Sequence, residues 1–275
     1  MSARRRSGDT ADEILAVEDA DGVRTLTFCR PEAANAFNNA LYLRAADALA
    51  EAAADDSVKA VVVTGRGTTF SAGTDLVEMA AMVSGLGQAE DPDASPAADH
   101  DAAASHPFAS FMDVLSTFPK PLLAAVNGAG VGLGFTMLLH CDLVLMASDA
   151  RLRVPFSAMG VAPEAGSSYL LPRRTGRQQA ALTLFTSRWV SAREAVEQGL
   201  ALAVCRPETV VIETLEIARA IAVHPLPSLM AIKELLLDGE RDGVARARAG
   251  EDAAFARLLR QPGMGADVTR QLGER

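Results

Sequence analysis

Apolar and polar residues follow two different periods along this chain, and together they predict strands that alternate with helices. Short apolar runs rich in β-branched residues, such as KAVVVT at 59–64, are typical of buried strands. Apolar residues from Leu41 to Ala52 instead recur at helical spacing, which predicts a helix near 39–53. Strands and helices that alternate in this way indicate an α/β fold. The predicted strands cover residues 23–28, 59–64, 122–127 and 143–147.

The C-terminal third of the chain is predicted to be almost entirely helical. Ser191, with Glu194 three residues later, forms a capping box, and Gly199 ends the helix that follows. Apolar residues at 235–237 and 255–259 either contact a neighbouring subunit or close the core of this chain. Further helices are predicted at 209–223, 227–237 and 244–260.

One long segment, residues 84–107, interrupts the pattern. It is acidic and contains no Lys or Arg, which predicts a mobile loop that is either functional or disordered. The resulting division has a flexible N-terminus at 1–12, a core at 13–205 that includes this loop, and a C-terminal helical region at 206–275.

Composition narrows the class of protein. The chain has 275 residues, of which 49% are apolar and 22% are charged, as is ordinary for a globular protein in water. A net charge of −9 argues against a nucleic-acid partner, and no apolar run is long enough for a membrane span. Three widely spaced cysteines predict free thiols in a reducing compartment. The N-terminus lacks the apolar run of a secretory signal, so we expect a cytoplasmic protein without membrane contact.

Two glycine-bearing turns, each directly after a predicted strand, carry the candidate chemistry. The first is GRGTTFSAGTDL at 65–76, and the second is NGAGVGLG at 127–134. Each leaves backbone N–H groups free near the start of a predicted helix, at 75–82 and 135–139 respectively. Neither has the GK[ST] sequence of a phosphate-binding Walker loop. Each could be only a tight turn, but the pair suggests an oxyanion hole made of two amides.

The sequence around these turns resembles a known family. TFSAGTDL and KPLLAAVNGAGVGLGFTMLLHCDLVL are similar to the two signature segments of the enoyl-CoA hydratase/isomerase (crotonase) superfamily. The resemblance extends from VRTLTFCRPEAANAF to PLPSLMAIKELL, nearly the whole chain. It implies a spiral core of ββα repeats and C-terminal helices that assemble a homotrimer or a dimer of trimers. It also implies an acyl-CoA substrate, with coenzyme A entering as part of the thioester and no metal or other cofactor.

The same resemblance implies roles for individual residues. The thioester oxygen would lie between the backbone N–H groups of Thr74 and Leu133. The main chain at Ala72 would meet the adenine end of coenzyme A, and Arg30 is a candidate for its phosphates. The candidates for coenzyme A binding are Arg30, Ala72, Gly73, Asp75 and Leu76. From the residues alone, Asp75 is more simply explained as the cap of the helix that follows it.

The carboxylates indicate which reaction the site performs. Hydratases of this family use two glutamates, and the matching positions here are Thr136 and Phe156, which cannot exchange protons near neutral pH. Glu164, in VPFSAMGVAPEAGSSYLLP, matches the single catalytic glutamate in the PF-S-x-x-G-x-x-x-E-G-x-S-S pattern of Δ3,Δ2-enoyl-CoA isomerases. This favours an isomerase in which one carboxylate shuttles a proton.

Other interpretations stay open at this stage. The protein could catalyse another reaction of the superfamily, including hydration with unusual groups. It could also be a non-catalytic acyl-CoA-binding subunit in which Glu164 only caps the helix that begins near 165–168. Among the remaining polar residues, His140 is interpreted as a buried core histidine and Asp142 as a packing or turn residue. No His pair has the helical spacing of metal ligands.

Overall fold

The computed structural model describes residues 4–5, 14–79 and 106–261. Most of the predicted flexible N-terminus, and nearly all of the predicted loop at 84–107, lie outside these residues. Pro107 does not belong to a loop, because it begins helix α5 (Pro107–Ser116). The helix predicted at 75–82 is described only over 76–79.

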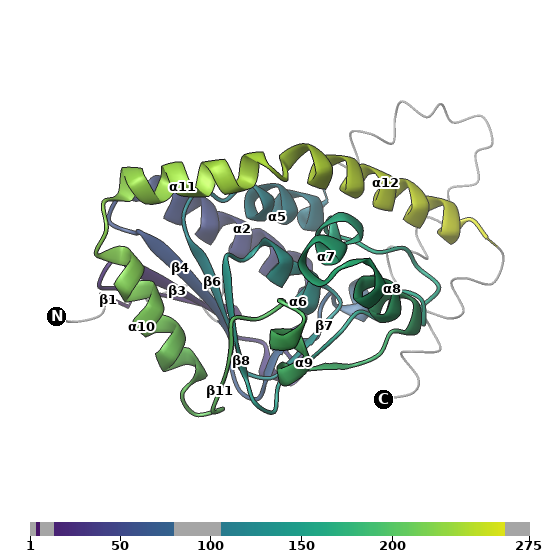
Figure 1. The fold of residues 1–275 in the computed structure, drawn as a ribbon, viewed down its shortest axis with the longest axis horizontal. Coiled ribbons are helices and arrows are strands. Elements are labelled where there is room, and N and C mark those ends of the chain that lie inside the picture. The colour runs from purple at the N-terminus through teal and green to yellow at the C-terminus, as the bar shows by residue number, and fades with distance from the viewer. Residues whose placement is uncertain (1–3, 6–13, 80–105, 262–275) are drawn as a thin grey trace.

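The core contains two sheets joined by repeated ββα units. In the larger sheet, β2 and β3 are antiparallel, and the neighbours from β3 to β11 are parallel (Figure 1). A strand of this sheet is followed by a short strand of the smaller sheet and then by a helical turn, as in β6, β7 and α6. The larger sheet has the order β1 (Arg4–Arg5), β2 (Leu15–Ala20), β3 (Val23–Phe28), β4 (Ala60–Gly65), β6 (Leu122–Val126), β8 (Leu143–Ala147) and β11 (Ala203–Cys205). The smaller has the order β10 (Val190–Ser191), β9 (Arg151–Arg153), β7 (Ala129–Val131) and β5 (Thr69–Ser71).

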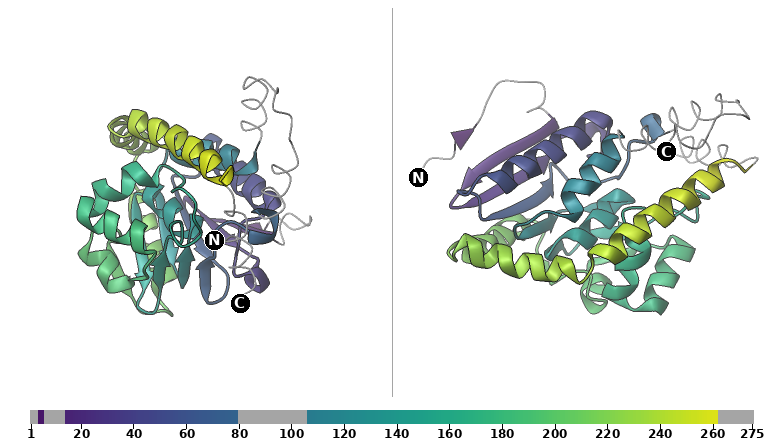
Figure 2. Two further views of the ribbon diagram at one scale, coloured as in Figure 1. Left: turned by 90° about the vertical axis from the view of Figure 1, so that its right-hand side faces the viewer. Right: turned by 90° about the horizontal axis from the view of Figure 1, so that it is seen from above.

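Helices surround these sheets. Strands β4 and β6 are buried along their whole length, as expected for parallel strands covered on both faces. Helices α11 and α12 run one after the other along the outside of the molecule, and α12 passes over α7 (Figures 1 and 2). The helices are η1 (Pro31–Ala33), α2 (Asn39–Ala54), α5, α6 (Leu133–Thr136), η2 (Met137–His140), α7 (Ser167–Thr175), α8 (Arg177–Thr186), α9 (Ala192–Glu197), α10 (Val210–Ala222), α11 (Leu226–Asp238) and α12 (Arg241–Leu259).

An aromatic cluster connects the core to the first glycine turn. Phe37 packs against Phe28, Tyr42 and Phe111, with ring centroids 4.8 to 5.5 Å apart. Edge and tilted ring pairs of this kind add about 0.5–1.5 kcal/mol beyond the area they bury. Phe28 also packs against Phe70 of the first glycine turn, with ring centroids 5.8 Å apart, so the cluster joins helix α2 to that turn.

The longer predicted helices and strands are confirmed, whereas the short elements could be defined only from the structure. Helices α2 and α10 to α12 and strands β3, β4, β6 and β8 lie within a few residues of their predicted bounds. The Ser191–Glu194 capping box is present, and Gly199 has the positive φ of 77° that such a helix end requires. The helix predicted at 135–139 is wrong as a single helix, because a four-residue α-helix passes into the 3₁₀ turn η2.

Helix α11 has an unusual exposure for its composition. It is rich in leucine and isoleucine, yet Lys233 is its only buried residue, and Leu235 and Leu236 are 76% and 62% exposed. Within the described part of the chain, no single helix is long and apolar enough to cross a membrane. Helices α10 and α11 would meet that test only as a pair bent by 109°.

Candidate active site

The two glycine turns meet at the edge of the smaller sheet, where β5 and β7 pair. A Cβ atom on Gly73 would lie 2.5 Å from the carbonyl oxygen of Val131 and 3.2 Å from the backbone N of Leu133. A Cβ atom on Gly134 would lie 2.3 Å from the carbonyl oxygen of Ser71. Neither position can hold a side chain without moving backbone. Glycine at both positions therefore allows the two turns to pack directly against each other.

The two predicted oxyanion donors are backbone amides that remain available. Leu133 is the first residue of α6, so its N–H has no partner within the helix. The peptide at Thr74 is held by the bonds on either side of it, from Phe37 N to Gly73 O (2.7 Å) and from Asp75 N to Phe37 O (2.9 Å). Among the described residues, neither the Thr74 nor the Leu133 amide donates a hydrogen bond.

The carboxyl group of Glu164 lies beside the second turn. Its Oε1 atom is 4.0 Å from the point where a Cβ atom on Gly132 would stand, next to the Leu133 amide. Removal of water from around the carboxyl group raises its pKa from 4.5 to about 7, with a smaller contribution from the negative charge of Glu251. A carboxyl group with a pKa near 7 can both accept and return a proton at neutral pH.

The helix-capping interpretation of Glu164 is wrong. Helix α7 begins after Gly166, and no side chain of its own turn caps it. The amides of Gly166 and Ser168 instead donate to Oε2 and Oε1 of Glu251, at 2.7 Å each. Glu251 belongs to α12, more than 80 residues away in sequence, and no local motif marks it. The side chain of Glu164 is therefore not engaged in holding the helix.

Tyr42 is a second residue near the site that the sequence did not single out. Its hydroxyl group is 2.8 Å from Oγ1 of Thr74, and the side chain is only 1% exposed. Burial raises its pKa well above the ordinary value, and the negative charge of Glu164 raises it further. The Tyr42 hydroxyl group therefore stays protonated at neutral pH and is close enough to Glu164 to sense its charge.

Two of the predicted coenzyme A ligands pair with each other. Both terminal nitrogens of Arg30 lie 3.1 Å from Oδ2 of Asp75, and each side chain is 16% exposed. Asp75 also accepts a hydrogen bond from Val77 N at its Oδ1 (3.1 Å), so the predicted capping role of Asp75 is confirmed. Ala72 N donates to Ala34 O (2.9 Å), and Leu76 begins the helical turn at 76–79.

The two positions that match the hydratase glutamates carry no proton-transfer group. Thr136 is fully buried, and its Oγ1 atom has no hydrogen-bond partner among the described residues. Phe156 is 6% exposed. His140 behaves as predicted for a core histidine, because burial lowers its pKa to about 4 and its Nε2 lies 2.8 Å from Ala165 O.

Asp142 has a structural role, as its position predicted. Its carboxylate accepts a hydrogen bond from Leu122 N (2.8 Å) and forms an ion pair with the buried Lys233 of α11 (2.8 Å). This pair anchors α11 to the end of β6. Among the residues that the structure describes, no group of three His, Cys, Asp or Glu side chains could hold a metal ion.

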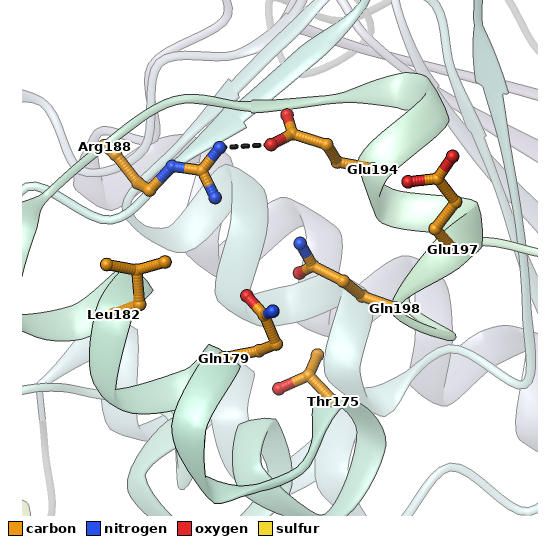
Figure 3. A pocket seen from close by; sticks show the side chains of 7 residues that line it. All are labelled: Thr175, Gln179, Leu182, Arg188, Glu194, Glu197 and Gln198. Carbon is orange, nitrogen blue, oxygen red and sulfur yellow. Dashed lines mark hydrogen bonds and ion pairs between the residues drawn. The ribbon is translucent and has the colours of Figure 1, made fainter.

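A separate cavity of about 490 Å³ lies between α8 and α9 (Figure 3). An ion pair between Arg188 and Glu194 closes one side of it. None of the predicted site residues lines this cavity. Its walls are formed by Thr175, Gln179, Leu182, Arg188, Glu194, Glu197 and Gln198.

Comparison with known proteins places this site in a family. The family model described as enoyl-CoA hydratase/isomerase matches residues 18–267. A crystal structure of an enoyl-CoA hydratase/isomerase from Pseudoalteromonas atlantica superposes with a TM-score of 0.83 at 33% identity, covering 95% of this chain and 98% of that one. The chain therefore belongs to the enoyl-CoA hydratase/isomerase family of acyl-CoA-processing enzymes and has the crotonase fold.

Relatives of similar identity carry out different reactions. The 1,2-epoxyphenylacetyl-CoA isomerase of Escherichia coli is 32% identical, with 80% of each chain covered. The peroxisomal enoyl-CoA delta isomerase 3 of mouse is 35% identical, covering 87% of this chain and 72% of that one. A 4-chlorobenzoyl coenzyme A dehalogenase of Arthrobacter (34%) and the 2,3-dehydroadipyl-CoA hydratase of Escherichia coli (31%) are as similar. Overall similarity thus gives the family but not the reaction.

Proposed function

We propose that this enzyme is a Δ3,Δ2-enoyl-CoA isomerase that moves a double bond by a proton shuttle on Glu164. The observation that carries the proposal is one carboxyl group with a pKa of about 7 beside two meeting glycine turns. The residues at the two hydratase positions, Thr136 and Phe156, support it because neither can activate water. The similarity to enoyl-CoA delta isomerases is consistent with this reaction.

The reaction would proceed in two proton transfers. The carboxylate of Glu164 removes a proton from C2 of a 3-enoyl thioester, and the electron pair moves into a conjugated dienolate. The amides of Thr74 and Leu133 donate to the oxygen of that dienolate, and each such donor contributes about 3–4 kcal/mol in comparable sites. Glu164 then returns the proton at C4, which gives the 2-enoyl thioester and regenerates the carboxylate.

Coenzyme A would bind as part of the substrate, without a metal or redox cofactor. The backbone from Ala72 to Leu76 forms the last part of the first glycine turn, where the adenine end would lie. Arg30 is already paired with Asp75, which leaves this pair nearly neutral. We therefore expect Arg30 to contribute less to phosphate binding than an unpaired arginine would.

A panel of acyl-CoA substrates tests the reaction. The conjugated product formed from 3-enoyl-CoA of graded chain length is followed by its ultraviolet absorbance, and crotonyl-CoA tests hydration. We expect isomerisation and slow or absent hydration. Rapid hydration that persists in Glu164→Gln would replace the isomerase proposal with a hydratase. Tight binding without turnover of either substrate would favour the non-catalytic subunit.

The exposed helix α11 supports assembly into a trimer or a dimer of trimers. Large apolar side chains on its surface, including Ile232, Leu235 and Leu236, are more than half exposed in the single chain. Burying such surface between subunits contributes about 25 cal/mol per Å². Light scattering should give a mass of three or six chains, and Leu235→Lys with Leu236→Lys should lower it. A monomeric wild-type protein at micromolar concentration would contradict this assembly.

A further inference from the structure

We propose that Glu251 of α12 is a positioning residue for Glu164, holding the catalytic turn from behind and facing its carboxyl group with a negative charge. The proposal rests on the isomerase function proposed above and adds a residue from the C-terminal helical region to its machinery. Glu251 is not expected to touch substrate. It would act through the backbone of residues 164–168 and through the electric field at Glu164.

The hydrogen bonds of Glu251 define the first part of this role. Its side chain is 5% exposed, and each carboxyl oxygen accepts one backbone N–H, from Gly166 and from Ser168, at 2.7 Å. Burial raises the pKa of Glu251 above its ordinary value, and the two N–H bonds oppose this by favouring the ionised form. Charge-assisted bonds to a carboxylate are about twice as strong as neutral ones. Both amides lie within four residues of Glu164, so the position of Glu251 fixes the turn that carries it.

This turn needs support from outside because its own backbone is strained. Ala165 has a φ of 61° and Gly166 a φ of 72°, so two successive residues occupy the left-handed region. A residue with a Cβ atom in that region costs about 1–2 kcal/mol. Such a conformation persists only where surrounding contacts determine it. The two bonds from Glu251 are contacts of this kind.

Close packing brings α12 near enough to place the carboxylate. A Cβ atom on Gly243 would lie 2.1 Å from Cζ of Tyr169, so the ring of this α7 residue rests directly on the α12 backbone. At the next residue of α12, Cγ1 of Val244 lies 3.2 Å from the point where a Cβ atom on Gly166 would stand. Glycine at position 243 therefore permits the close approach of α7 and α12.

The electrostatic part of the role follows from the same placement. Among the residues that the structure describes, Glu251 is the charged group that raises the pKa of Glu164, after the larger effect of burial. Arg248, on the same helix, forms an ion pair with Asp113 (2.8 Å). The described titratable or charged groups around this region include Glu251, Arg248 and Asp252 on α12, Asp113 on α5, His140 on η2, Arg174 on α7, Lys233 on α11 and Tyr42 on α2.

The test compares Glu251→Gln with Glu194→Gln, because Glu194 also accepts a backbone N–H bond at a helix start but lies in the separate capping box of α9. Turnover of 3-enoyl-CoA is measured across about pH 5 to 9, together with KM and the melting temperature. For Glu251→Gln we expect kcat to fall at least about 10-fold with little change in KM, since small misplacements of a catalytic group have effects of up to about 100-fold. The kcat and pH profile of Glu194→Gln should not change.

A titration that does not depend on activity separates this proposal from the isomerase function. The carboxyl carbon of Glu164, labelled with ¹³C and assigned by its loss in Glu164→Gln, is followed by NMR in each variant. Its pKa should fall in Glu251→Gln and stay high in Glu251→Asp, which keeps the charge and provides a second variant if the first does not fold. An inactive wild-type enzyme would overturn the isomerase function and leave this titration interpretable. If Glu251→Gln lowers only the melting temperature, leaving kcat and the Glu164 titration unchanged, Glu251 is a structural cap and the proposal is wrong.

Discussion

Two turns in this molecule place a glutamate just before or within the first turn of a helix, and the two glutamates differ in almost every property. In the first turn of α9, the carboxylate of Glu194 accepts hydrogen bonds from the backbone N (2.9 Å) and Oγ (2.8 Å) of Ser191 and pairs with Arg188. These bonds lower its pKa to about 2. Before α7, the capping work is done by Glu251, and burial raises the pKa of Glu164 to about 7.

The comparison shows that the structure frees the side chain of Glu164 from capping its own helix. A glutamate that satisfies its own helix is held ionised and cannot exchange protons near neutral pH. A glutamate whose helix is capped by a distant residue is free to face a substrate. The cost of this arrangement is a partly buried carboxyl group whose charged form is disfavoured. The same cost makes the group useful as a base and acid.

The largest expected difference is in kcat, when Glu164 and Glu194 are each replaced by glutamine. Glu164→Gln removes the proton shuttle and should lower kcat by about 10²–10⁴-fold, which corresponds to about 3–5 kcal/mol of barrier. Affinity for a coenzyme A thioester should change little, because the Thr74 and Leu133 amides are untouched. Glu194→Gln is the matched control and should keep its turnover. A Glu164→Gln variant with more than about a tenth of wild-type kcat would show that the shuttle is another group.

The pH profile should report the raised pKa of Glu164. The reaction begins with the carboxylate form, so kcat/KM should rise about tenfold per pH unit below the pKa and level off near pH 7. This is measured with 3-enoyl-CoA under first-order conditions. A plateau that extends down to pH 5 would mean that Glu164 titrates like an ordinary glutamate.

Stability should depend on pH with opposite signs at the two turns. Because the folded pKa of Glu164 is above its ordinary 4.5, its protonated form is favoured on folding, and that contribution is lost as pH rises towards about 7. At pH 8 the wild type carries an ionised Glu164 that folding disfavours, whereas glutamine stays neutral. Glu164→Gln should therefore be more stable than wild type at pH 8, by up to about 3 kcal/mol. Glu194, with its pKa lowered to about 2, stabilises above pH 4.5 and loses this effect on acidification. Urea unfolding measured at pH 8 and at acidic pH gives the pH dependence of stability for each variant. A Glu164→Gln variant less stable than wild type at pH 8 would contradict the expectation for Glu164.

A smaller loss of stability is expected from the capping box itself. Glu194→Ala removes the acceptor for Ser191 N and the partner of Arg188. Loss of a helix cap costs about 0.5–2 kcal/mol, so the melting temperature should fall by a few degrees. Turnover measured below that temperature should match wild type. A fall in kcat would mean that α9 is coupled to the Glu164 turn.

The smallest expected effect concerns the strained residue next to Glu164. Ala165 has a φ of 61°, and it stands where the isomerase pattern has glycine. Ala165→Gly relieves the left-handed strain of about 1–2 kcal/mol but adds unfolded-state entropy worth about 0.5–1 kcal/mol. We expect a net gain below about 1 kcal/mol in calorimetry, with turnover preserved. A clear loss of stability would show that the Ala165 side chain itself is needed in the turn.

The sequence by itself determined the regular elements and the family. Strands such as β4 and helices such as α2 and α10 are long enough for their periods to be read, and the two glycine turns follow directly from strand ends. The resemblance of TFSAGTDL and of the segment around Asn127 gave the superfamily, which the family model and the solved structures confirm. The position of Glu164 within its motif also came from the sequence, although its catalytic role stays a prediction.

Only the tertiary structure decided how these parts are held. The smaller sheet consists of strands of two or three residues, too short for any period, and forms because β5, β7 and β9 meet through the core. The pairing of Arg30 with Asp75 joins residues 45 positions apart. The cap supplied by Glu251 and the hydrogen bond between Tyr42 and Thr74 also join distant segments. Such contacts leave no local pattern, because their geometry exists only once the chain has folded around the apolar core.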